Sequence, residues 1–176
     1  MSDEKVLTKE IAEEFLADED SVDLSEFTAI EDAAAESLSK YEGDIILYSL
    51  TKLSDAAAES FSKHQEGLEL DGLTELSDTA AESLSRYQGE LLCLNGLTEL
   101  SDAAAESFSK LQGDLSLNGL TELSDAAAKS FSKYQRELDL GGLRVLSETA
   151  AENLSMVEYI FISQDCKALI DKYKKR

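Results

Sequence analysis

A segment of about 23 residues recurs along the chain, and this internal repetition constrains the fold more than any other feature. The clearest copies are Leu68–Glu90 and Leu115–Glu137, which read LELDGLTELSDTAAESLSRYQGE and LSLNGLTELSDAAAKSFSKYQRE. One apolar position recurs at intervals of 23, 23, 24, 23 and 23 residues, and it is occupied by Phe27, Leu50, Leu73, Leu97, Leu120 and Leu143. Regular copies of this length predict a solenoid, in which each repeat buries its apolar face against its neighbours.

Each copy has the pattern of a short strand followed by a helix. The run Leu68-Glu69-Leu70-Asp71 alternates, which predicts a strand buried on one face that pairs with equivalent strands of neighbouring copies. The Asp-Gly or Asn-Gly that follows is expected to turn the chain, because glycine accepts a positive φ. Ser77-Asp78 then begins a helix of about ten residues, which we expect to end at Gly89.

The two ends of the chain depart from the repeat and predict caps, which a solenoid needs to hide its apolar ends. Residues 1–20 are expected to form an N-terminal cap, with a helix over 3–17, because Leu7, Ile11 and Phe15 recur every four residues. Six repeats are expected over 21–158, and a C-terminal cap over 159–176. In that region, residues 156–162 are apolar enough for one more buried strand, and Ser163 begins a last helix with a basic tail.

Composition excludes several classes of function. The formal net charge of −21 argues against a nucleic-acid partner, because binding phosphates requires clustered Lys and Arg. No stretch approaches the roughly 20 apolar residues of a membrane span, and the acidic N-terminus lacks the apolar region of a signal peptide. The two cysteines, Cys93 and Cys166, form no disulfide framework and indicate a reducing compartment. We therefore expect a cytoplasmic protein without nucleic-acid or membrane partners.

Candidate catalytic and metal-binding residues are better explained as structure. The motif Ser-x-x-Lys, typical of some serine acyl-enzymes, recurs at the same helix position of four copies, whereas a catalytic nucleophile is needed once. The four matches are Ser37 to Lys40, Ser60 to Lys63, Ser107 to Lys110 and Ser130 to Lys133. His64 is the only histidine, and other copies have Tyr, Leu or Val at its position, so neither a His-assisted nucleophile nor a zinc site can be assembled. The acidic strand positions are interrupted and do not concentrate oxygen ligands for calcium. We predict no enzyme, no cofactor and no metal.

The outward side chains of the strands form the candidate binding site. These positions vary between copies while the core positions stay nearly constant, and the strand faces of a solenoid form an extended binding surface. The candidate residues are Ile46, Tyr48, Glu69, Asp71, Cys93, Asn95, Ser116, Asn118 and Asp139. Ile46 and Tyr48 are the large apolar members beside carboxylates, which favours a basic partner segment. The alternative, a solvated sheet face whose Asn and Asp serve the turn, stays open.

The residues LxLxGLTxLSDxAAESLSKYQG resemble a leucine-rich repeat family, and more narrowly the bacterial leucine-rich-repeat-like proteins abundant in planctomycetes. The resemblance covers about residues 20–162. It implies a curved α/β solenoid with a parallel sheet on the concave face, and a family habit of protein binding. The usual LxxLxLxxNxL block has an Asn where Leu73, Leu97 and Leu120 stand here, so the copies are closer to the cysteine-containing subclass, with Leu in place of the cysteine.

We therefore predict a non-enzymatic scaffold that binds a protein partner on its concave strand face. A free face requires a monomer, with at most weak self-association. The alternative is a structural or self-associating solenoid without a dedicated ligand, and that alternative requires an assembly.

Overall fold

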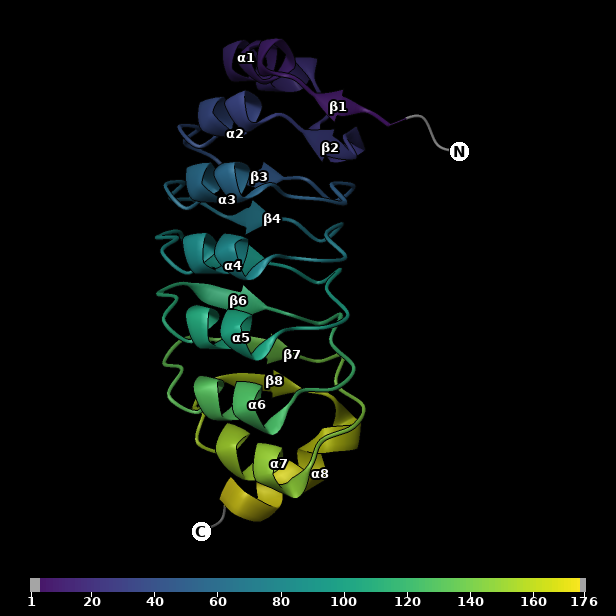
Figure 1. The fold of residues 1–176 in the computed structure, drawn as a ribbon, viewed down its shortest axis with the longest axis vertical. Coiled ribbons are helices and arrows are strands. Elements are labelled where there is room, and N and C mark those ends of the chain that lie inside the picture. Colours follow the sequence, from purple (N-terminus) through teal and green to yellow (C-terminus); the bar gives the residue numbers. More distant parts are fainter. Residues whose placement is uncertain (1–3, 175–176) are drawn as a thin grey trace.

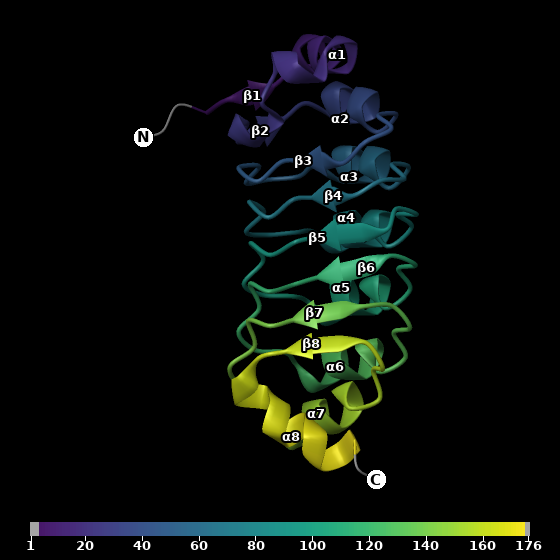
Figure 2. The ribbon, with the colours of Figure 1, turned by 180° about the vertical axis from the view of Figure 1, so that it is seen from behind.

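The structure, a computed structural model, describes residues 4–174 and is an α/β solenoid (Figures 1 and 2). Strands β3 to β8 form one sheet in sequence order, and every neighbouring pair is parallel. Helices α2 to α7 form a second layer against the sheet, and α1 and α8 cover the two ends of the stack. The predicted fold class is confirmed.

The strands of the main sheet are β3 (Ile45–Ile46), β4 (Leu68–Glu69), β5 (Leu91–Cys93), β6 (Asp114–Ser116), β7 (Leu138–Leu140) and β8 (Ile160–Ile162). The helices of the second layer are α2 (Asp32–Leu38), α3 (Asp55–Phe61), α4 (Asp78–Leu84), α5 (Asp102–Phe108), α6 (Asp125–Phe131) and α7 (Glu148–Leu154). The register follows the repeat, since Leu68 pairs with Leu92 and Leu115 pairs with Leu138. Equivalent residues of successive repeats therefore stand side by side.

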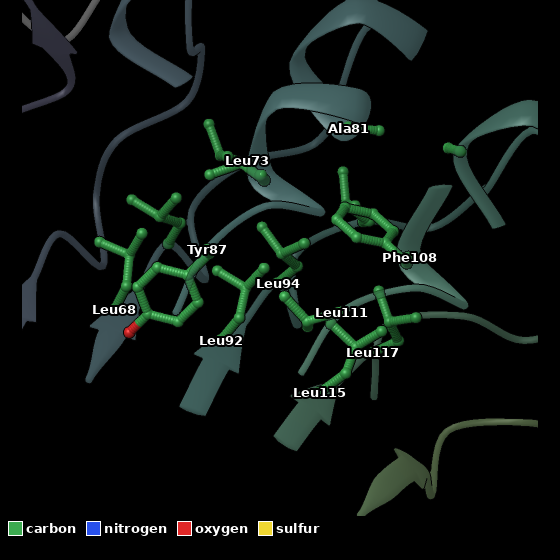
Figure 3. Close-up of a cluster of buried hydrophobic side chains, with 14 of the residues drawn as sticks. Leu68, Leu73, Ala81, Tyr87, Leu92, Leu94, Phe108, Leu111, Leu115 and Leu117 are labelled. Carbon is green, nitrogen blue, oxygen red and sulfur yellow. The ribbon is translucent and has the colours of Figure 1, made fainter. Parts of the chain in front are cut away.

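The core lies between the sheet and the helices and consists of equivalent residues from each repeat. Figure 3 shows Leu68, Leu92 and Leu115 on adjacent strands, with the ring of Tyr87 beside the first two. Leu68 and Leu92 are fully buried, as is Ala81 on the facing helix. Each buried leucine contributes about 1.5–3 kcal/mol to folding, and the small alanines let the helices lie close to the sheet. Burial thus depends on neighbours at every repeat, as a solenoid requires.

A row of Ser–Asp hydrogen bonds joins the starts of the helices. Helices α3 to α7 are capped by Ser54, Ser77, Ser101, Ser124 and Ser147. In α4, the hydroxyl of Ser77 accepts a hydrogen bond from the backbone N–H of Ala80 at 2.9 Å. The same hydroxyl donates to the carboxylate of Asp55, which begins the preceding helix. Each of the other four serines likewise donates to the aspartate that begins the helix before its own. The Leu-Ser-Asp motif therefore both caps a helix and joins two repeats.

The helices are shorter than predicted. α4 ends at Leu84 rather than near Gly89, and Tyr87 is buried in the turn that follows the helix. No residue within 4–174 has a positive φ, so the expectation that glycines close the helices or turn the chain in that conformation is wrong. Glycine is needed because repeats approach closely: a Cβ on Gly96 would lie 2.2 Å from the carbonyl oxygen of Asp71.

The N-terminal end differs from the prediction in two ways. Helix α1 spans Lys9–Ala17, and the stretch before it contains β1 (Val6–Leu7), which pairs parallel with β2 (Ala29–Ile30). Residue 3, where we expected the helix to begin, lies outside the described residues. The first repeat also contributes no strand to the main sheet. Instead, 3-10 turns η1 (Glu19–Ser21) and η2 (Leu24–Glu26) occupy this stretch.

The loss of the first strand has a local cause. The Asp23 carboxylate accepts hydrogen bonds from the backbone N–H of Ser25 at 2.9 Å and from its hydroxyl at 2.6 Å. This local bonding competes with strand pairing, because it folds the chain back within two residues.

The C-terminal cap consists of β8 and helix α8 (Gln164–Lys174), whose Cys166 and Ile170 are buried. The prediction of a buried strand over 156–162 is wrong in extent and in exposure. Only Ile160–Ile162 form a strand, and the exposed fractions of Met156, Tyr159 and Phe161 are 62%, 56% and 57%. Tyr159 and Phe161 alternate with Ile160, so they fall on the outward side of the sheet.

No helix within residues 4–174 is long and apolar enough to cross a membrane.

Candidate functional site: the strand face

We call the outward side of the main sheet, which faces the viewer in Figure 2, the strand face. It consists of three columns of equivalent residues. The first column is Asp44, Gly67, Leu91, Asp114, Glu137 and Tyr159; the second is Ile46, Glu69, Cys93, Ser116, Asp139 and Phe161; the third is Tyr48, Asp71, Asn95, Asn118, Gly141 and Ser163. The nine predicted site residues lie in the second and third columns. Our sequence reasoning missed the first column and Phe161, although the strand alternation and the repeat register could have placed them.

The Asp and Asn side chains of the third column bond to the backbone of the next repeat. Asn95 N–H donates to Asp71 Oδ1 at 3.0 Å, Asn118 N–H to Asn95 Oδ1 at 2.9 Å, and Gly141 N–H to Asn118 Oδ1 at 2.7 Å. Asn118 also donates through its side-chain amide to Asp139 Oδ2 at 2.7 Å. These residues form a ladder that holds successive repeats in register, so they serve the fold whatever else they bind.

Two predicted site residues in the middle of the face are nearly buried. Cys93 and Ser116 are each 8% exposed, and the Ser116 hydroxyl donates to Asn95 Oδ1 at 2.7 Å. Burial raises the pKa of the Cys93 thiol to about 12, so the thiol is neutral at ordinary pH and is not an activated nucleophile. Cys93 and Ser116 therefore offer little apolar area to a partner, whereas Leu91, in the first column of the same strand as Cys93, is 37% exposed.

A cleft of 460 Å³ opens beside the predicted pair Ile46 and Tyr48. Tyr48 is 48% exposed, and the pKa of its hydroxyl is raised by a hydrogen bond to the Glu69 carboxylate. The opposite wall comes from the N-terminal cap and the first repeat, whose lining residues are Phe15, Glu19, Asp20, Val22, Asp23, Leu24 and Ser25. The cap and the first repeat thus contribute one wall of a site that the sequence placed on the strands alone. The acidic residues before the first repeat were the feature of the sequence that could have indicated this second wall.

The strand face carries unbalanced negative charge. Its carboxylates are Asp44, Glu69, Asp71, Asp114, Glu137 and Asp139, and none of the three columns contains Lys, Arg or His, although the chain has 16 Lys and Arg. Several of these carboxylates accept hydrogen bonds from neutral groups, as Asp114 does from the N–H of Glu137 at 3.0 Å. Neutral donors orient a carboxylate without cancelling its charge. The face therefore attracts cationic groups.

The histidine and one of the serines considered as candidate catalytic residues lie as follows in the structure. His64 is fully buried, and the Ser37 hydroxyl donates to the Ala33 carbonyl within its own helix at 3.1 Å. Within residues 4–174, no group of His, Cys, Asp and Glu side chains is arranged to hold a metal ion.

Comparison with known proteins finds no family model that matches this sequence and no curated protein that matches it. The class of the protein is therefore defined by its fold, an α/β repeat solenoid.

Proposed function

We propose that this protein is a non-enzymatic interaction scaffold that binds another protein on its strand face. The observation that carries the proposal is the cleft at the N-terminal end of that face. It combines an exposed aromatic ring, Tyr48, with the partly buried Ile46 and with carboxylates on the opposite wall. Apolar side chains that a partner can desolvate supply affinity, and charges around them mainly set the association rate and the specificity. The proposed partner presents a basic segment.

We also propose that the chain is a leucine-rich repeat protein of the bacterial type. The support is the order of strand, turn and helix within repeats of 23 or 24 residues, together with the motif quoted above. Cys93 and Cys166 are buried and unpaired, which supports a reducing, cytoplasmic compartment.

The test compares two double variants of the full chain. Ile46→Ser with Tyr48→Ser removes the apolar part of the cleft. Val145→Ser with Met156→Ser is the matched control, because these side chains are 66% and 62% exposed and lie outside the three columns of the strand face. Each protein is immobilised, captured proteins are identified by mass spectrometry, and the affinity of each purified candidate is then measured.

We expect wild type and the control to bind the same partner, and the cleft variant to lose it while its melting temperature stays within a few degrees of wild type. Equal binding by all three proteins would contradict the proposal. A large fall in melting temperature would show that Ile46 and Tyr48 belong to the core. Light scattering over a range of concentrations addresses the alternative, since a structural or self-associating solenoid would form an assembly and a scaffold with a free face would stay monomeric.

A further inference from the structure

The strand face has a second apolar end. Tyr159 and Phe161 are exposed by 56% and 57% and occupy the last positions of the first and second columns. Phe161 lies on β8, the strand farthest from the cleft, and Tyr159 directly precedes that strand. Most residues between the two ends are polar, and Asp71, Asn95, Asn118 and Asp139 belong to the ladder of hydrogen bonds between repeats. Leu91 in the first column is the exception, with 37% of its surface exposed. One face therefore carries exposed aromatic rings at both ends and, between them, an acidic stretch that also contains Leu91.

We propose that the strand face binds one extended basic segment that crosses all six strands, with an apolar side chain held at each end. One end is held in the cleft by Ile46 and Tyr48, and the other is held by Tyr159 and Phe161. This inference rests on the proposed function and adds the length and chemistry of the segment. Exposed aromatic groups at interfaces commonly mark the anchoring positions of a partner.

The spacing of the two ends sets the length of the segment. Neighbouring strands lie about 4.8 Å apart, so the five steps from β3 to β8 cover about 24 Å. An extended peptide advances about 3.3 Å per residue, so about seven residues separate the two apolar positions. Two anchors on one segment reinforce each other only when the linker spans both sites.

Charge selects a basic segment over a second copy of this chain. The carboxylates between the two ends include Glu69, Asp114 and Glu137, and no cation lies among them in the three columns. Two copies placed face to face and antiparallel would match apolar ends, but they would also bring these carboxylates against each other. Like charges across an interface cost binding energy, whereas lysines and arginines in the segment would gain it.

The probes are three fluorescent synthetic peptides with four lysines each. The first has leucines at both ends and a seven-residue spacer, LKGKGKGKL. The second brings the leucines closer, LKKKKL, and the third replaces them by serines, SKGKGKGKS. Fluorescence anisotropy at physiological salt measures the dissociation constants with wild type, with Phe161→Ser, and with the Ile46→Ser and Tyr48→Ser variant. Val145→Ser is the control.

We expect LKGKGKGKL to bind wild type and the control about tenfold more tightly than the other two peptides. Phe161→Ser and the cleft variant should each remove that advantage, with circular dichroism unchanged. Equal affinity for all three peptides, or no binding at all, would overturn the inference. Loss of binding in the cleft variant but not in Phe161→Ser would also overturn it and leave the proposed function standing. Self-association of wild type that Phe161→Ser abolishes in sedimentation would show that a second copy occupies the face, and would equally overturn it.

Discussion

The hydroxyl of Ser77 donates a hydrogen bond to the carboxylate of Asp55, and these two residues begin the helices of adjacent repeats. The bond spans 22 residues of sequence but joins direct neighbours in the stack. Because the same hydroxyl accepts the backbone N–H of Ala80, one side chain contributes both to its own helix and to the contact between repeats. Neighbour-dependent bonds of this kind make the unfolding of a solenoid cooperative.

Ser77→Ala should lower the free energy of unfolding by about 1–2 kcal/mol, because it removes a helix cap and a bond between repeats. Ser85→Ala is the matched control, since the Ser85 hydroxyl donates to the Glu82 carbonyl of its own repeat at 2.7 Å and, among residues 4–174, makes no bond to a neighbouring repeat. Urea denaturation measures both variants. If Ser77→Ala cost no more than Ser85→Ala, the cap and the bond to Asp55 would contribute nothing measurable.

Gly96→Ala should destabilise the protein by about 1–3 kcal/mol, because the added Cβ would lie 2.2 Å from the backbone oxygen of Asp71 and the repeats would have to separate. Gly141→Ala is the comparison, since the nearest atom to its Cβ is a side-chain oxygen, Asn118 Oδ1, at 2.8 Å. A side chain can move where a backbone cannot, so we expect a smaller loss there. Thermal denaturation that ranked the two in the opposite order would contradict this explanation of the glycines.

His64 should make stability fall in mildly acidic solution. The side chain is fully buried beside the ring of Tyr87, and neither ring nitrogen forms a hydrogen bond within residues 4–174. Burial lowers the pKa of His64, and the backbone groups of Gly67 and Ser39, followed by the carboxylates of Glu66 and Asp44, oppose this shift only in part. In the unfolded chain the imidazole has its ordinary pKa of about 6.5. As the pH falls below this value, the unfolded chain therefore binds a proton before the folded protein does.

The stability associated with His64 is thus complete above about pH 6.5 and is lost as the pH falls toward the lower pKa of the folded state. His64→Leu removes the titrating group, and Leu111 already occupies the equivalent position of another repeat. Urea denaturation of both proteins from pH 7.5 to 5 should show wild type losing stability relative to His64→Leu. Parallel curves for the two proteins would mean that His64 does not titrate in this range.

A chain that ends at residue 158 should aggregate or fail to fold, because it lacks β8 and α8 and exposes Leu140, Leu143 and Leu154. Phe161→Ser in the full chain is the control, since it changes the same cap at an exposed position and should stay folded. Size-exclusion chromatography and binding of a hydrophobic dye distinguish the outcomes. A soluble, cooperatively folding truncated protein would show that the cap is dispensable.

Several details of the site depend on contacts between repeats, which the periodicity within one repeat cannot reveal. The strand alternation predicted that Ile46 and Tyr48 lie on the outward face, but it did not show that Leu24 and Asp20 lie opposite them across a cleft. It also assigned Asn95 and Asn118 to a turn, whereas their side chains accept the backbone N–H of the equivalent residue one repeat later. Both features join residues more than 20 positions apart, at distances set by the stacking of repeats.

The class of fold, the register of the sheet and the composition of the core all follow from the amino-acid repeat. A repeat of 23 residues brings each leucine or alanine beside its equivalent in the next copy. Stacking the copies in this register buries more apolar surface than other arrangements of the same elements would. The ends of the helices, the need for glycine at Gly96 and the absence of a strand in the first repeat emerge only from the three-dimensional contacts. These outcomes depend on ångström-scale contacts between neighbouring repeats and on the local hydrogen bonds of Asp23, which compete with pairing that the repeat pattern alone would favour.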